Sequence, residues 1–157
     1  MNLPKPRAHR TLKAAAVIAD APWRLWCATL FVAALGLRLT ALFSLGRDLA
    51  FVKYTVAASL LVEGKLTGER VLDFSPLYLE LHRLAHLAGL VDLDVLRAIQ
   101  CVLGAGTCLL VCLIGTNLLG RGVGLLAGSL AALSGDMVLY DQVLEPEALL
   151  VFLSALA

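Results

Sequence analysis

The feature that most constrains this chain is Ala98–Gly120, a run of 23 residues without one charged side chain. Leu25–Leu45 and Gly122–Tyr140 carry one charge each. A helix needs about 20 apolar residues, at about 1.5 Å each, to cross the roughly 30 Å hydrocarbon core of a bilayer. Since 60% of the residues are hydrophobic and 16% are charged, the sequence predicts an integral membrane protein. It excludes a soluble fold, a disordered chain and a secreted disulfide scaffold.

The apolar segments predict an all-α, polytopic bundle of membrane helices. In it, Gly124 and Gly128 form a small-xxx-small pattern that favours close helix packing. The last segment supplies only about 15 Å of helix, so we expect a span truncated in this sequence, from a larger multispanning protein whose activity needs the missing part. The expected spans are about 23–45, 96–119, 123–140 and 148–157.

The amino terminus sets the expected orientation. Residues 1–22 carry four Lys or Arg and one acid, which by the positive-inside rule makes them a cytoplasmic tail. They do not begin a signal peptide, because the apolar stretch that follows is longer than an ordinary signal core and no clear cleavage site comes after it. Alternation then places segment 46–95 and the 140–147 connection outside, and the 120–122 turn inside.

The external segment 46–95 predicts interfacial helices. Its charges recur every few residues, which excludes a membrane hairpin. Ser75 and Pro76 supply an N-cap and a proline at the first helical position, and Phe51–Val62 predicts a second, more apolar helix. Both helices are expected to lie along the membrane interface. The helix that begins at Pro76 has an apolar stripe, which consists of Leu77, Leu81, Leu84 and Ala88.

Cysteine and histidine spacings permit metal binding without favouring it. Cys108 and Cys112 lie one helical turn apart, which suits a metal if a third soft ligand is near, but packing of small residues in a membrane helix explains them better. His82 and His86 have the same spacing, and a polar face turned to water or lipid phosphate is favoured over a pair of metal ligands. No cofactor is certain, and a divalent metal stays open.

Acidic residues fall in two groups on the expected outer face. Asp48 follows the first span and is either a solvated charge paired with Arg47 or a functional group. Acids that face the interior of a membrane bundle are candidates for function. Glu147 opens a helix, where both helix capping and catalysis are open. The second group consists of Asp136, Asp141, Glu145 and Glu147.

Arg38 is a basic residue inside the first predicted span, about two turns from its outer end. Its guanidinium either reaches the lipid headgroups or meets an anionic group inside the bundle, and the sequence leaves both open. The whole chain has a net charge of only +1. Because this gives no general basic field, no nucleic acid is expected as a partner.

Four runs of sequence, taken together, resemble a known family. They combine a Pro-Leu-Tyr external helix, an arginine at the start of the next span, a Gly-Arg turn and an acid-Ala-Leu-Leu start of a span. This order is similar to the amino-terminal third of GT-C glycosyltransferases, more narrowly the family-39-like group of protein mannosyltransferases and lipid A aminoarabinose transferases. The likeness covers roughly residues 25–157. The runs are Asp73–Tyr78, Leu96–Gln100, Leu118–Ala127 and Leu139–Leu153.

The resemblance implies an activity and a set of site residues. It implies transfer of a sugar from a polyprenyl-phosphate-linked donor to a lipid, protein or glycan acceptor. The reaction is expected on the extracytoplasmic face of a bacterial inner (plasma) membrane, and the protein is expected to contact membrane lipids. Asp48 matches the acid that acts on the acceptor, and Glu147 matches the acid that opens the fourth span, so these are the expected catalytic residues. The expected substrate-binding residues are Arg38, Tyr54, Tyr78, Arg97, Asp141 and Glu145.

Two other classes of membrane protein are also open. A multispanning transporter could use the acids to line a pathway, although broken helices near the midplane are more typical of transporters. A noncatalytic membrane subunit would need none of these groups for chemistry.

Overall fold

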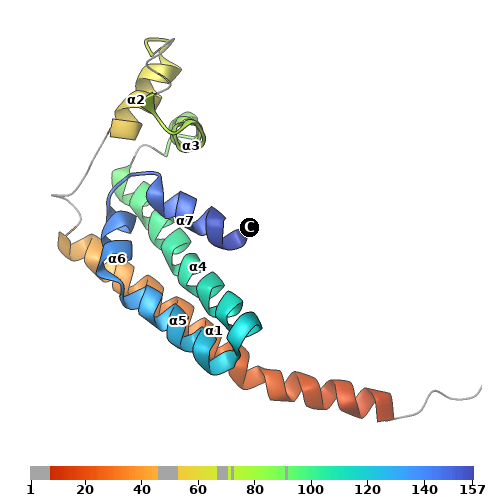
Figure 1. Cartoon of the computed structure of the whole chain (residues 1–157). Helices are drawn as coiled ribbons and strands as arrows, with labels where there is room; N and C mark the ends of the chain where they lie inside the picture. Colours follow the sequence, from red (N-terminus) through yellow and green to blue (C-terminus); the bar gives the residue numbers. More distant parts are fainter. Residues whose placement is uncertain (1–7, 46–52, 67–70, 72, 91) are drawn as a thin grey trace, which may run out of the picture.

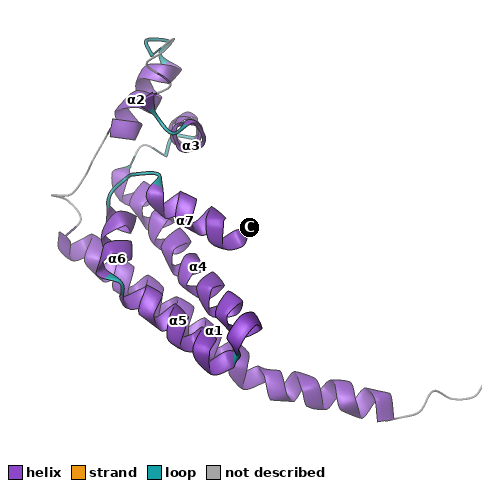
Figure 2. Ribbon diagram, viewed as in Figure 1, coloured by secondary structure: helices purple, strands orange, loops and turns teal. Residues whose placement is uncertain are grey.

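The described part of the chain is helical throughout. The computed structural model describes residues 8–45, 53–66, 71, 73–90 and 92–157, and no strand occurs among them (Figure 1 and Figure 2). The helices are α1 (Ala8–Leu45), α2 (Lys53–Val62), α3 (Pro76–Leu87), α4 (Leu93–Leu119), α5 (Arg121–Leu133), α6 (Gly135–Gln142) and α7 (Glu147–Leu156).

Two of these helices are long and apolar enough to cross a membrane. They are α4 and the Pro22–Ser44 part of α1. The pair α5–α6 makes a third crossing segment if the two are counted as one bent span. The all-helical fold and the membrane-length helices agree with what the sequence predicts.

α1 begins earlier than the sequence suggests. The first span was expected from about residue 23, after a separate tail, but the helix starts at Ala8 and continues through Pro22. Residues 14–21 contain five alanines, the strongest helix former, and this extends the helix toward the amino terminus. The expected tail of residues 1–22 is therefore helical from Ala8.

The third expected span, 123–140, is not one helix. α5 ends at Leu133, Ser134 is extended at φ −64° and ψ 113°, and α6 begins at Gly135. The two helices meet at a bend of 53°. A Ser-Gly pair is a common cause of such a kink. The bend packs α6 against α1 and α4.

The bundle is built around α4, against which α1, α5, α6 and α7 pack (Figure 1). The close approach of α5 depends on its glycines. A Cβ atom on Gly128 would lie 2.7 Å from the Cβ of Cys112 and 2.9 Å from the carbonyl oxygen of Cys108. Both cysteines are fully buried at this contact. The predicted small-xxx-small packing is confirmed, and packing explains these two cysteines.

α2 and α3 pack against each other beyond the amino-terminal end of α4 (Figure 2). Ser75 takes the extended conformation of an N-cap before Pro76, as predicted, although its hydroxyl makes no capping hydrogen bond. α3 turns Tyr78 and His82 inward. Its predicted apolar stripe stays exposed, as an interfacial helix requires. The exposed members are Leu77, Leu81 and Leu84.

We predict that Gly124→Ala destabilises the protein by about 1–3 kcal/mol, because overpacking a close contact costs energy of that order. A Cβ at Gly124 would overlap the Oγ1 atom of Thr116 and the carbonyl oxygen of Cys112, and this backbone has no room to move. Thermal unfolding of the purified protein in detergent, followed by circular dichroism, measures the change.

The matched control is Gly36→Ala in α1, where an added Cβ meets nothing within 4 Å. Alanine has the higher helix propensity, so this variant should be neutral or more stable by up to about 1 kcal/mol. Equal unfolding temperatures for the two variants would contradict the close packing of α4 and α5.

Candidate functional site

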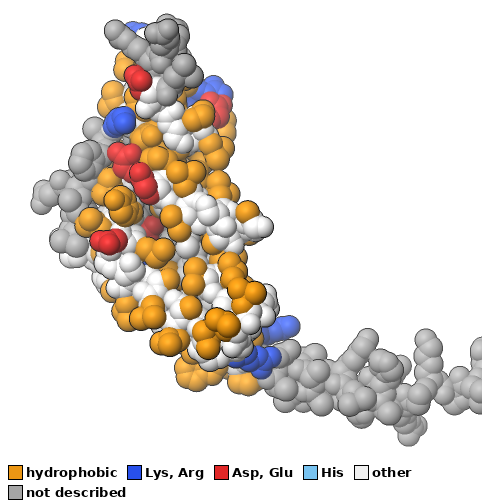
Figure 3. Space-filling model, in the orientation of Figure 1, with side chains coloured by type: hydrophobic (Ala, Val, Ile, Leu, Met, Phe, Trp, Pro, Cys, Tyr) orange, Lys and Arg blue, Asp and Glu red, His pale blue; other side chains and the backbone are white. Residues whose placement is uncertain are grey.

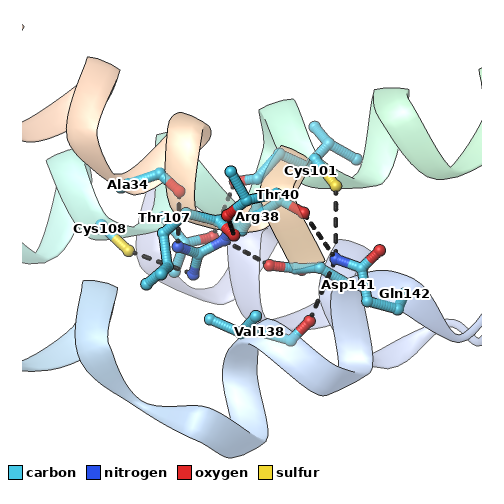
Figure 4. A network of polar contacts seen from close by, with 11 residues as sticks. Ala34, Arg38, Thr40, Cys101, Thr107, Cys108, Val138, Asp141 and Gln142 are labelled. Atoms are coloured by element: carbon cyan, nitrogen blue, oxygen red, sulfur yellow. Dashed lines mark hydrogen bonds and ion pairs between the residues drawn. The ribbon is translucent and has the colours of Figure 1, made fainter. Parts of the chain in front are cut away.

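A buried ion pair lies at the centre of the bundle. Arg38 on α1 donates from Nε to Oδ2 of Asp141 on α6 over 2.5 Å (Figure 4). Arg38 is completely buried and Asp141 is 3% exposed. Of the two alternatives that the sequence leaves open for Arg38, the structure therefore selects the anionic partner inside the bundle over the lipid headgroups.

The remaining donors of Arg38 are also used. Nη1 donates to the backbone carbonyl of Ala34 over 3.2 Å, and Nη2 lies 3.4 Å from the sulfur of Cys108 (Figure 4). A charge inside a membrane bundle is tolerated only when it is paired and hydrogen-bonded. The guanidinium thus has its charge neutralised by Asp141 and its donors committed to α1 and α4.

Gln142 is a site residue that the sequence analysis missed. Its side-chain amide nitrogen donates to the backbone carbonyl of Arg38 over 3.2 Å and to that of Val138 over 3.4 Å, and it lies 3.6 Å from the sulfur of Cys101 (Figure 4). Gln142 is completely buried. One amide group therefore joins α6 to both α1 and α4. A signal for it is its position next to Asp141, at the end of an apolar stretch.

Gly104 on α4 makes room for the ion pair. A Cβ atom at this position would overlap the carboxylate of Asp141. The sequence suggests only that small residues favour helix packing, and nothing in it reveals which side chain occupies the space. The glycine lets a charged side chain lie directly against the α4 backbone.

A small cavity brings the ion pair together with Glu147. Its volume is about 50 Å³, and its lining includes Arg38, Asp141 and Glu147, which come from α1, α6 and α7. Glu147 is exposed and lies in the first turn of α7. Because Arg38 already pairs with Asp141, the carboxylate of Glu147 is the group of the three best placed to accept a proton. Helix capping stays open for Glu147 as well, since the dipole favours an acid there.

Tyr54 and Tyr78 lie in a separate centre, the outer aromatic cluster, formed by Tyr54, Phe74, Tyr78 and His82. The ring centroids of Tyr54 and Tyr78 are 4.8 Å apart, and those of Tyr78 and His82 are 4.6 Å apart. The hydroxyl oxygen of Tyr54 accepts a hydrogen bond from the backbone N–H of Ser75 over 3.3 Å. The cluster joins α2 to α3.

His82 corrects a prediction. We expected it on a polar face turned to water or lipid phosphate, but it is only 6% exposed. Burial lowers the pKa of His82, so the ring is neutral near pH 7. Burial is also the main cause that raises the pKa of Tyr78, with the carboxylates of Glu145 and Glu147 as smaller contributors. Those two acids therefore lie within electrostatic range of the outer aromatic cluster.

Arg97 and Glu145 lie near the amino-terminal end of α4. Arg97 is 1% exposed, and its Nη1 lies 3.4 Å from Oδ1 of Asp94. Its Nε and Nη2 have no hydrogen-bond partner in the described structure. The backbone carbonyl of Glu145 accepts a hydrogen bond from Gln100 over 3.0 Å. Of the expected site residues, Asp48 lies outside the described residues, so its proposed role stays a prediction.

The described residues contain no group of three His, Cys, Asp or Glu side chains arranged to hold a metal ion. Comparisons of the chain with protein-family models, curated proteins and solved structures give no match. The function must therefore be argued from the site itself and from the resemblance in sequence.

We predict that Arg38→Met lowers the free energy of unfolding by about 3–5 kcal/mol, since it leaves the buried carboxylate of Asp141 without its partner. The double variant Arg38→Met/Asp141→Leu should recover most of that loss, because it removes the second charge too. Chemical unfolding in mixed micelles measures both.

The control is Arg83→Met, which breaks the exposed pair of Arg83 with Glu80 on α3. Exposed ion pairs contribute little, so no measurable change is expected. If the double variant is as unstable as Arg38→Met, the loss of stability in the single variant does not come from the unpaired charge of Asp141.

Proposed function

We propose that this chain is the amino-terminal part of a GT-C glycosyltransferase, of the family-39-like type, in a multi-pass membrane bundle. It transfers a sugar from a polyprenyl-phosphate-linked donor to an acceptor on the extracytoplasmic face. The observation that carries the proposal is the cavity lined by Arg38, Asp141 and Glu147. These residues come from three different helices, and Glu147 matches the acid that opens the fourth span in the family that the chain resembles.

The proposed chemistry is one direct displacement. The acceptor hydroxyl oxygen attacks the anomeric carbon of the sugar, a carboxylate takes the hydroxyl proton, and the bond from the anomeric carbon to the phosphate oxygen breaks with its electron pair on the phosphate. A positioned base contributes about 10²–10⁴-fold. Glu147 fits the role of base because its carboxylate has no ion-pair partner among the described residues, and Asp48 fits it by the resemblance. A single displacement inverts the anomeric configuration.

The leaving phosphate needs a positive partner rather than an acid. Arg38 is poorly suited, because its charge is already neutralised by Asp141. Arg97 is better suited, since two of its three guanidinium nitrogens have no partner among the described residues. Hydrogen bonds from a guanidinium to a phosphate are among the stronger ones in proteins.

The distribution of charge supports the proposed orientation in a bacterial inner membrane, with the amino terminus in the cytoplasm. On the face shown in Figure 3, the acidic side chains lie in the upper half together with scattered Lys and Arg side chains, and the lower end has Lys and Arg side chains without acids. At that lower end the guanidinium of Arg121 lies 5.4 Å from the ring of Trp23. Basic residues are typical of the cytoplasmic side of a bundle, and tryptophan is typical of a membrane interface on either side.

A transporter is the second candidate function, and one observation favours it. The 53° bend between α5 and α6 resembles the interrupted helices of transporters, and it brings a buried ion pair into the bundle. The acids Glu145 and Glu147 lie outside the apolar helices or at their ends, which favours the enzyme.

We predict that Glu147→Gln and Asp48→Asn each lower sugar transfer by about 10²-fold or more, because an amide keeps the shape of the acid but cannot accept a proton. Binding of the donor should change little. The assay uses membranes of cells that express the protein from its whole gene, with a labelled polyprenyl-phosphate sugar.

The control is Glu63→Gln, since Glu63 is exposed and pairs with Lys65 over 2.7 Å beyond the end of α2. It should alter transfer by less than a few-fold. Near-normal turnover in both Glu147→Gln and Asp48→Asn, with loss of turnover in Glu145→Gln, would assign the base to Glu145 instead.

A further inference from the structure

An apolar groove that the proposed sugar transfer does not use lies between α1 and the second half of α4. Its volume is about 440 Å³. An engineered apolar cavity of about 150 Å³ is enough to take up benzene, so this groove has room for a longer chain. It is lined by Trp23, Arg24, Cys27, Ala28, Phe31, Leu109 and Leu113.

The groove follows from the spacing of large and small side chains. On α1, Trp23 and Phe31 lie two turns apart and form raised walls, with Cys27 and Ala28 as the low floor between them. On α4, Leu109 and Leu113 lie one turn apart and form the opposite wall. Large residues separated by small ones along a helix leave a hollow between them.

The charges at the groove select its occupant. Arg24 is exposed and is the only charged residue among its lining residues. An apolar groove that ends at an exposed cation complements an amphiphile with one hydrocarbon chain in the groove and a negative headgroup at its end.

We propose that this groove is a binding site for an anionic phospholipid, whose acyl chain lies between α1 and α4 and whose phosphate contacts Arg24. The site holds whether or not the protein transfers a sugar. Its position at the basic, tryptophan-bearing end of the bundle places it in the leaflet that carries anionic lipids in the proposed orientation. The attraction is electrostatic at the headgroup, so it weakens as salt rises.

The test uses Trp23 as a reporter inside the groove. The sequence has two tryptophans, so Trp26→Phe leaves Trp23 alone. The full chain with this change is placed in phosphatidylcholine vesicles that contain either brominated phosphatidylglycerol or brominated phosphatidylcholine at equal mole fraction. Bromine quenches a tryptophan that it touches. We expect the anionic lipid to quench Trp23 at several-fold lower mole fraction than the neutral lipid.

Two further variants decide the assignment. Arg24→Gln should reduce the preference for the anionic lipid to none, and Ala28→Phe should weaken quenching by both lipids because it fills the floor of the groove. Arg83→Gln, an exposed cation on α3, is the control and should leave the preference unchanged. Equal quenching by the two lipids in the starting protein, or an unchanged preference in Arg24→Gln, would overturn the proposal.

Discussion

The ion pair between Arg38 and Asp141 is the interaction on which the bundle depends. It joins α1, the first apolar helix, to α6, the second half of the bent pair, at a depth where neither side chain reaches solvent. An unpaired charge there would cost several kcal/mol, so the two residues must be buried together. The bend at Ser134 allows this, because it packs α6 against α1 and α4.

The features around the pair serve the same arrangement. Gly104 leaves the space that the carboxylate of Asp141 fills, and Gln142 joins α6 to α1 and α4 through one amide. α7 then follows α6 after a short connection and places Glu147 at the same cavity. A paired charge, a glycine and a kink thus bring Glu147, which has no ion-pair partner among the described residues, to the cavity beside the buried pair.

Much of the fold could be predicted because membrane-length apolar runs leave few choices. The segments around α1, α4 and α7 and the start of α3 follow from charge-free stretches and from the Ser-Pro pair. The kink at Ser134 and the helical start at Ala8 could not, since hydropathy does not distinguish a bent span from a straight one or a tail from a helix. The partner of Arg38 could not be predicted from the sequence either, because Asp141 lies 103 residues away and only packing brings the two side chains together.

The central claim is that this site serves sugar transfer rather than transport. The most direct measurement follows a labelled sugar in sealed vesicles that contain the protein expressed from its whole gene, with the polyprenyl-phosphate donor in the lipid. Our account predicts that label moves from the donor to an acceptor at a rate that does not depend on a proton gradient. Gradient-driven uptake of solute into the vesicles, with no loss of sugar from the donor, would contradict it.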